Sequence, residues 1–295
     1  MMGGQRELKA LLEDAGIRPS KRLGQNFLVD ANLMRIIVKE AALSSDDVVL
    51  EIGCATGRLT ELLAREAGTV YGVEIDHQLA EIARKRLAGF DGVVVDAEDI
   101  MESKSALNSM VVTRLKALMA GDKGRHLKVV SNLPYSVGSP AVIGLLLSDL
   151  AIELMVVTLQ REVTRRITAK AGGKEYGTLS VLAQVFSDVR SVRSIPPSAF
   201  WPKPEVSSTI LRFDVKSQAR ETIKDVETLL GLLRVVFGFR RKKLRSAIRF
   251  LAAKAGEEAT LKLLEGAGID LNRRGESLSP NELVMLADLL AESPV

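Results

Sequence analysis

A four-residue turn, Asn132-Leu133-Pro134-Tyr135, carries the groups best suited to handling a flat molecule that bears an amine. It follows the β-branched run Lys128–Ser131, a pattern typical of a strand that stops at a rigid turn. There the amide oxygen of Asn132, nearby backbone carbonyls and the ring of Tyr135 share one small volume, which suits a nucleobase. Proline after a strand is also ordinary turn chemistry, so both interpretations stay open for this tetrapeptide alone.

Small and acidic residues follow two earlier predicted strands. The loop Gly53–Gly57 comes after Val48–Glu51, and its small residues let backbone N–H groups approach a ligand closely. Glu74 ends the run Val70–Glu74, where a carboxylate can accept two hydrogen bonds from a ribose diol. Asp76, two residues later, suits a helix N-cap. The loop lacks the three glycines of a dinucleotide site, so it predicts no particular cofactor by itself.

Two acids after the run Val93–Val95 are candidates for binding an adenine amino group, namely Asp96 and Asp99. The carboxyl ends of parallel strands meet at one edge of a sheet. We therefore expect one of these acids, together with Glu74 and the turn at Asn132, to outline a pocket for an adenosine-containing cofactor.

Short β-rich runs alternate with helical patterns between residues 48 and 213, which predicts an α/β fold with a doubly wound, mostly parallel sheet. The expected strands are Val48–Glu51, Val70–Glu74, Val93–Val95, Lys128–Ser131, Leu154–Leu159, Ser180–Phe186 and Thr209–Phe213. The expected helices are Leu59–Glu66, His77–Leu87, Val111–Met119, Pro140–Asp149 and Arg161–Lys170. The last two strands lack a helical pattern between them, which predicts an antiparallel edge pair.

Beyond Val215 the pattern is helical, which predicts a smaller all-helical C-terminal domain. Its expected helices are Asp225–Phe237, Lys242–Ala255, Glu257–Gly266 and Pro280–Ala291. The predicted domains are residues 1–215 and 216–295, joined by Lys216–Thr222. The segment Met101–Leu127 is long for a connection and suggests no function.

Composition favours a soluble globular protein, because 46% of the 295 residues are hydrophobic and 26% are charged. No apolar run approaches the roughly 20 residues that cross a bilayer, and residues 1–14 do not resemble a secretory signal. Cys54 is the single cysteine, so we expect no disulfide, no metal site and a reducing, cytoplasmic setting.

Basic and aromatic residues form two further groups in the second half of the chain. The net charge is +4, and the run Phe239–Arg249 is basic without an acid, which suits a phosphate backbone or simply a solvated helix face. The proline-rich loop 196–204 holds Phe200 and Trp201, which suit either base stacking or a hydrophobic plug.

Taken in order, these segments resemble the ribosomal RNA adenine dimethyltransferase family, specifically its small-subunit branch. The resemblance runs from about Lys21 to Leu290. Its motifs are GQNFL (24–28), EIGCATG (51–57), VEID (73–76), NLPY (132–135), LQREV (159–163), YGTLSVLAQ (176–184), PPSAFWPKPEV (196–206), RRKKLR (240–245) and RGESLSPNEL (274–283).

The resemblance implies a Rossmann-like methyltransferase that uses S-adenosylmethionine. Its implied reaction is N6-methylation, with dimethylation expected, of adjacent loop adenosines near the 3′ end of small-subunit ribosomal RNA in a pre-ribosomal particle. It implies a monomer in the cytoplasm, with no membrane partner. The implied cofactor residues are Asn26, Leu28, Gly53, Glu74, Asp99 and Asn132, where the family's spacing favours Asp99 and its Asp-Ala pair favours Asp96. The implied catalytic residues are Asn132, Leu133, Pro134 and Tyr135. The implied substrate-binding residues are Phe200, as a second stacking face, and Arg240, Arg241, Lys242, Lys243 and Arg245.

Two departures from the family pattern and three rival functions remain. The chain has Gly53-Cys54-Ala55 where the family has Gly-Pro-Gly, and the extra methyl group of Ala55 is expected to lower cofactor affinity. The segment Met101–Leu127 is longer than the family norm. The rivals are a large-subunit rRNA adenine methylase of the antibiotic-resistance type, a noncatalytic ribosome-assembly or transcription factor on the same scaffold, and a DNA adenine methylase.

Overall fold

The computed structural model describes residues 2–120, 125–240, 242–252, 261 and 264–292. The chain divides into two compact units, one formed by Met1–Thr164 and Val189–Val215, the other by Arg165–Asp188 and Lys216–Val295. This division shares the predicted joint at residue 216 but places residues 165–188 with the C-terminal helices. The reason is that helix α8 (Thr178–Phe186) packs against α9 (Val226–Gly238) and α12 (Pro280–Glu292).

A seven-stranded sheet in the order β4-β3-β2-β5-β6-β9-β7 organises the first unit. The strands are β2 (Asp47–Ile52), β3 (Thr69–Val73), β4 (Val93–Asp96), β5 (His126–Ser131), β6 (Ile152–Gln160), β7 (Ser187–Ile195) and β9 (Ser208–Val215). The pairs from β4 through β6 are parallel, and β9 runs antiparallel to β6. This topology confirms the predicted doubly wound α/β fold.

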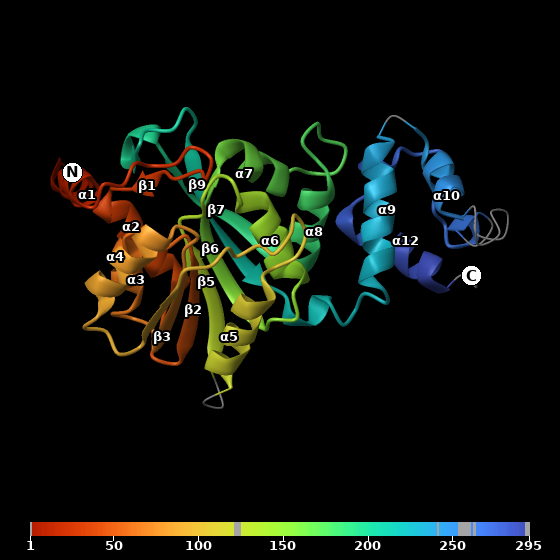
Figure 1. The fold of residues 1–295 in the computed structure, drawn as a ribbon. Helices are drawn as coiled ribbons and strands as arrows, with labels where there is room; N and C mark the ends of the chain where they lie inside the picture. Colours follow the sequence, from red (N-terminus) through yellow and green to blue (C-terminus); the bar gives the residue numbers. More distant parts are fainter. Residues whose placement is uncertain (1, 121–124, 241, 253–260, 262–263, 293–295) are drawn as a thin grey trace. The chain divides into compact units, whose positions relative to one another are not determined.

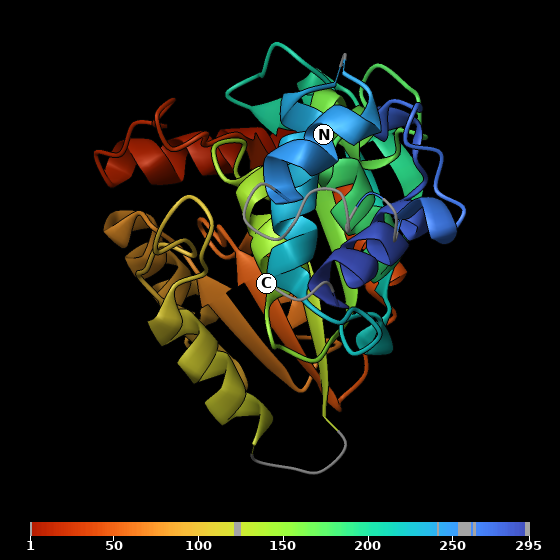
Figure 2. The same cartoon turned by 90° about the vertical axis from the view of Figure 1, so that its right-hand side faces the viewer.

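Helices cover both faces of this sheet (Figures 1 and 2). They are α2 (Ala31–Ala41), α3 (Arg58–Leu63), α4 (His77–Leu87), α5 (Ser109–Met119), α6 (Gly138–Leu147) and α7 (Arg161–Ile167), with α1 (Met2–Asp14) at the N-terminus. The apolar face of α2, including Leu33 and Ile37, packs into a core with Val49 of β2 and Val156 of β6. Burying these side chains holds the strand ends in fixed register.

A two-stranded antiparallel ribbon joins the N-terminal segment to the proline-rich loop. Strand β1 (Phe27–Leu28) pairs with β8 (Phe200–Trp201), so Leu28 lies opposite Phe200. The ring of Phe27 stacks on that of Trp201 with centroids 6.4 Å apart. The GQNFL motif is therefore part of a small sheet.

The predicted strand Ser180–Phe186 is wrong, because these residues form most of α8. Six of the nine residues of α8 are buried, and a short, mostly apolar run does not by its period distinguish a helix from a strand. The missed strand is β7, whose residues are mostly polar and exposed. The predicted antiparallel edge pair of Ser180–Phe186 with Thr209–Phe213 is therefore wrong: Thr209–Phe213 lies in β9, which is internal to the sheet and runs antiparallel to β6.

The second unit also contains α10 (Leu244–Ala252), which packs against α9. The helix predicted at Lys242–Ala255 begins two residues later than expected. The helix predicted at Glu257–Gly266 lies largely outside the described residues. Among the residues that the structure describes, none of the helices combines the length and apolar character that a membrane crossing requires.

Candidate functional site

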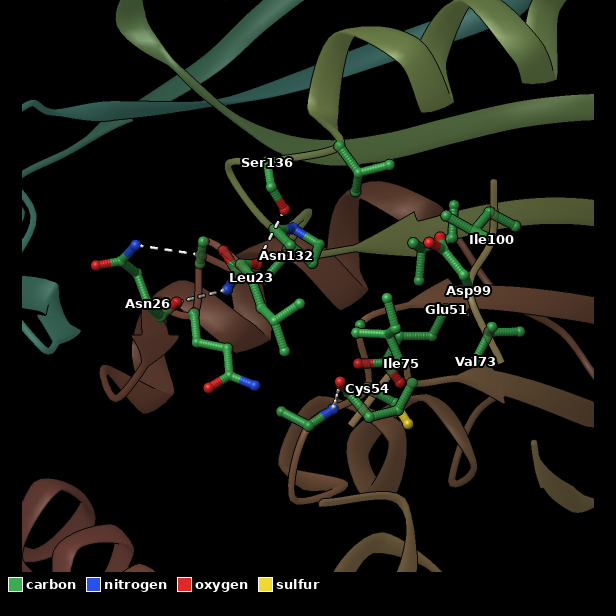
Figure 3. A pocket seen from close by; sticks show the side chains of 18 of the residues that line it. Leu23, Asn26, Glu51, Cys54, Val73, Ile75, Asp99, Ile100, Asn132 and Ser136 are labelled. Carbon is green, nitrogen blue, oxygen red and sulfur yellow. Dashed lines mark hydrogen bonds between the residues drawn. The ribbon is translucent and has the colours of Figure 1, made fainter. Parts of the chain in front are cut away.

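A cavity of about 520 Å³ opens in the first unit at the carboxyl ends of the parallel strands. Figure 3 shows Asn26 and Asn132 toward one end of it, and Asp99 and Ile100 toward the other. The structure brings every predicted cofactor residue to its lining: Asn26, Leu28, Gly53, Glu74, Asp99 and Asn132. Residues far apart in the sequence therefore form one site, as expected where parallel strands end.

Gly53 is required by its backbone and by a close neighbour. Its φ is +73°, a left-handed conformation that side chains rarely adopt. A Cβ atom there would lie 2.6 Å from Cγ of Pro134. The glycine loop is thus packed directly against the turn that follows β5.

Ala55 adopts a left-handed conformation without being glycine. Its φ is +52°, and its backbone N–H donates a 2.9 Å hydrogen bond to Oε2 of Glu74. The Cβ atom costs roughly 1–2 kcal/mol in this region of backbone space. The departure from the family pattern at Ala55 therefore adds backbone strain, in addition to a methyl group at the cavity wall.

We expect Ala55→Gly to raise the free energy of unfolding by about 1 kcal/mol, because glycine relieves the left-handed strain. Urea denaturation measures this change. Ala42→Gly should behave in the same way, since Ala42 has φ +45°. Ala88→Gly, at φ −57°, should instead lower stability by roughly 0.5–1 kcal/mol. If Ala55→Gly lowered the free energy of unfolding as Ala88→Gly does, the backbone of Ala55 would not be strained.

Glu74 is held so that its carboxylate faces the cavity. It is buried, Oε1 accepts a 3.0 Å hydrogen bond from the N–H of Asp76, and Oε2 accepts from Ala55. Burial raises the pKa of Glu74, which these backbone donors partly offset. Asp76 caps α4 through the N–H groups of Gln78 and Leu79, which confirms its predicted capping role.

The structure separates the two candidate adenine acids. Asp99 lines the cavity, and its Oδ1 accepts a 2.9 Å hydrogen bond from the N–H of Met101. Asp96 is absent from the lining, and its Oδ2 accepts a 2.9 Å hydrogen bond from the hydroxyl of buried Tyr71. This placement supports Asp99 as the adenine-binding acid.

We expect Asp99→Ala to weaken binding of S-adenosylhomocysteine roughly tenfold, the effect of losing one hydrogen bond to a charged group. Asp96→Ala should leave the dissociation constant within about twofold. It should instead lower stability by about 1 kcal/mol, because the Tyr71 hydroxyl loses its acceptor. Isothermal titration with S-adenosylhomocysteine measures both dissociation constants. If Asp96→Ala weakened binding more than Asp99→Ala, Asp96 would be the adenine-binding acid.

The turn after β5 is hydrogen-bonded to the GQNFL segment. Nδ2 of Asn132 donates to the carbonyl of Asn26 at 3.2 Å, and the hydroxyl of Ser136 donates to the carbonyl of Leu23 at 2.9 Å (Figure 3). Gly24 has φ +65°, and a Cβ atom there would lie 2.6 Å from the nitrogen of Ser136. The two segments can therefore meet only because residue 24 is glycine.

Tyr135 and Phe200 support each other outside the cavity lining. The Tyr135 hydroxyl bonds to the hydroxyl of Ser208 at 2.6 Å, and its ring meets that of Phe200 edge-on with centroids 6.3 Å apart. Phe200 is only 3% exposed and belongs to the hydrophobic core. A ring so deeply buried has no free face, so this structure does not support Phe200 as a second stacking surface.

Sequence reasoning missed several residues of the cavity wall. Residues 101–104 line it as part of a tight hairpin, closed by the bridge between Met101 and Leu107. This hairpin gives the long segment after Asp99 a place in the site. The signal available in the sequence was its unusual length alone.

Glu51 is a further unexpected lining residue. Its side chain is buried, and Oε2 has no hydrogen-bond partner among the described residues. Burial, with a smaller contribution from the nearby Glu74 charge, raises the pKa of Glu51 to about 8. The Glu51 carboxyl is therefore mostly protonated at neutral pH, and the wall carries less negative charge than its acids suggest.

The basic run of the second unit mostly precedes α10. Arg240 pairs with Glu276 at 2.6 Å and donates to the carbonyls of Gly173 and Lys174. Lys242 and Lys243 are exposed, and Arg245 pairs with Glu265. Arg241 lies outside the described residues. Arg240 and Arg245, two of the predicted RNA-binding residues, thus form ion pairs within the second unit.

A comparison with known families adds to this geometry. The sequence profile described as "Ribosomal RNA adenine dimethylase" matches residues 17–292. The chain belongs to this family. Full-length relatives agree: a protein of Alkaliphilus metalliredigens named ribosomal RNA small subunit methyltransferase A is 34% identical, with 96% of each chain covered. One of the same name from Staphylococcus haemolyticus is 36% identical, with 94% of this chain and 92% of that protein covered.

Solved structures show the same fold as this adenine dimethylase family member. A dimethyladenosine transferase from Plasmodium falciparum has a TM-score of 0.71 at 24% identity, covering 87% of this chain and 94% of that one. The 23S rRNA methyltransferase ErmE has a TM-score of 0.60 at 22% identity, covering 90% and 100%. The family match confirms the prediction of an rRNA adenine methyltransferase that uses S-adenosylmethionine.

The residues of the cavity fit this cofactor. Two acids of the lining, Glu74 and Asp99, can accept hydrogen bonds from a ribose diol and an adenine amine, and the carboxyl of Glu51, whose Oε2 has no partner among the described residues, adds a polar group to the same wall. Gly53 and Leu28 supply close backbone approach and an apolar surface. All residues that line this cavity belong to the first unit.

Proposed function

We propose that this protein dimethylates N6 of adjacent loop adenosines near the 3′ end of small-subunit ribosomal RNA during ribosome biogenesis. The observation that carries the proposal is the Asn132 amide at the wall of the cofactor cavity, hydrogen-bonded to the carbonyl of Asn26. Similarity over nearly the whole chain to relatives named for the small subunit supports the choice of RNA.

The chemistry concerns the adenine amine, whose lone pair is delocalised into the ring. S-adenosylmethionine supplies an activated methyl group, so that a C–N bond forms as the C–S bond breaks and its electron pair stays on sulfur. Oδ1 of Asn132 and the carbonyl of Leu133 accept the N6 hydrogens and favour the pyramidal nitrogen. They also stabilise the positive charge that grows on it. The methylated ammonium then loses its proton to solvent.

The remaining residues of the turn orient the base. Pro134 packs against Gly53 and stiffens the turn, and Tyr135 offers a ring that holds the adenine in line. Because the target must leave its stack, an unpaired loop adenosine is the natural substrate. We also propose that the protein acts as a monomer on a pre-ribosomal particle in the cytoplasm, a setting that the single buried Cys54 suits.

Incubation with labelled S-adenosylmethionine and undermethylated small ribosomal subunits tests this function. Mapping should place dimethylated adenosines side by side near the 3′ end of the small-subunit RNA. A parallel reaction with large subunits tests the rival, because label in large-subunit RNA instead would favour the antibiotic-resistance type of methylase. Absence of label in either RNA would favour the noncatalytic assembly factor.

The exposed lysines before α10 should contact RNA phosphates. We expect Lys242→Glu and Lys243→Glu each to weaken RNA binding and to reduce the slope of log affinity against log salt by about 0.7 per lost contact. Filter binding at several salt concentrations measures both quantities. Lys85→Glu, an equal charge change at an exposed site on α4, should have little effect. If all three variants lost RNA affinity equally, the loss would reflect the net charge of the protein and not a contact at Lys242 or Lys243.

A further inference from the structure

Thr158 lies beside Asn132 at the carboxyl ends of two neighbouring strands. Strands β5 and β6 are parallel, with Ser131 opposite Val157, so the next residue of each strand is Asn132 and Thr158. The Thr158 side chain is completely buried, and on its other side Thr158 pairs with Ile210 of β9. A β-branched side chain in a central strand has little rotational freedom.

Two hydrogen bonds hold the Asn132 amide from opposite atoms. The hydroxyl of Thr158 donates to Oδ1, while Nδ2 donates to the carbonyl of Asn26 at 3.2 Å. Turning the amide over would place Oδ1 against the Asn26 carbonyl, and two acceptors cannot bond to each other. Both contacts therefore select the same orientation.

This orientation is the one that methyl transfer needs. An amide oxygen has two acceptor sites, so Oδ1 keeps one free for an N6 hydrogen after bonding Thr158. Loss of one neutral hydrogen bond lets the Asn132 amide turn or shift, and small misplacements of a reacting group lower the rate. Thr158 does not line the cavity, so it acts through Asn132.

We propose that Thr158 is a positioning residue for methyl transfer, because its buried hydroxyl holds Oδ1 of Asn132 where it accepts a hydrogen from adenine N6. The proposal rests on the catalytic role proposed for Asn132. It goes beyond the sequence motif, in which Thr158 precedes LQREV and has no assigned role.

Steady-state kinetics of Thr158→Val and Thr158→Ala test this role. We expect kcat to fall roughly three- to tenfold in both, the effect of one hydrogen bond. KM for the small subunit and the dissociation constant of S-adenosylhomocysteine should stay within about twofold. Thr158→Ser keeps the donor and should restore kcat. A merely structural role would move stability or KM and would leave kcat unchanged.

Thr209→Val provides the matched control. Thr209 is a buried threonine of β9 that pairs with Leu159 and has no contact with the Asn132 amide among the recorded hydrogen bonds, so kcat should stay at the wild-type value. Wild-type kcat in Thr158→Val and Thr158→Ala overturns the proposal, as does a Thr158→Ser enzyme as slow as Thr158→Val.

Asn132→Ala in the same assay separates the role proposed for Thr158 from the role proposed for Asn132. If it is inactive while Thr158→Val is fully active, only the role of Thr158 fails; if it is fully active, both roles fail.

Discussion

Replacing Asn132 by alanine will slow methyl transfer to adenosine by about 10²–10³-fold, the usual cost of removing one donor or acceptor aimed at transition-state charge. The variant loses the oxygen that accepts an N6 hydrogen, whereas Glu74 and Asp99 remain in place at the cavity wall. Binding of S-adenosylhomocysteine should therefore weaken only a few-fold. Single-turnover transfer of label to undermethylated small subunits measures the chemical step directly.

Asn32→Ala is the matched control for this experiment. Asn32 is exposed on α2, and its side chain bonds only to Arg35 among the recorded contacts. It should transfer methyl groups at the wild-type rate. Transfer by Asn132→Ala at the rate of Asn32→Ala would remove Asn132 from the mechanism, whatever the cofactor affinity.

Glu74→Ala will weaken binding of S-adenosylhomocysteine by about 100-fold. Hydrogen bonds to a charged group contribute roughly 1.5–3 kcal/mol each, and the ribose diol offers two donors. The variant also leaves the N–H groups of Ala55 and Asp76 without their acceptor at the cavity wall. Isothermal titration with S-adenosylhomocysteine measures the loss, and exposed Glu66→Ala should bind normally.

A deoxyribose analogue shows whether the ribose is the reason for this loss. The wild-type protein should bind 2′-deoxy-S-adenosylhomocysteine more weakly than the ribose form, because one donor is missing. Glu74→Ala should bind the two compounds nearly equally, since the acceptor is already gone. An undiminished preference for the ribose form in Glu74→Ala would place the diol elsewhere.

The strands and their ends could be predicted because local patterns carry the information. Runs such as Val48–Glu51 and Lys128–Ser131 are β-branched and apolar, and the buried core demands that pattern. The run Ser180–Phe186 is short and mostly apolar, so its pattern also suits a buried strand, and its helix packs against α9 and α12. The polar strand β7 carries no such signal at all.

The adenine acid shows where local patterns reach their limit. Asp96 and Asp99 are both aspartates and lie three residues apart. The family's spacing favours Asp99, whereas its Asp-Ala pair favours Asp96. The difference is made by Tyr71, whose hydroxyl binds Asp96 across the strand pair β3–β4. Such a contact joins residues 25 apart in the sequence, and no local pattern reveals it.

The amino-acid pattern alone places Glu74 and Asn132 at strand ends, with Asp96 or Asp99 after a third strand, because parallel pairing brings the ends of such apolar runs to one edge. It also marks the loop at Gly53 as a place of close backbone approach, whereas the need for glycine at residue 24 appears only in the fold, where a Cβ atom would meet Ser136. The orientation of these groups follows from the fold and not from the local pattern. The Asn132 amide is aligned by the carbonyl of Asn26 and the hydroxyl of Thr158, and the Phe200 ring is buried against Tyr135. Orientation depends on contacts between distant segments, which exist only once the sheet has formed.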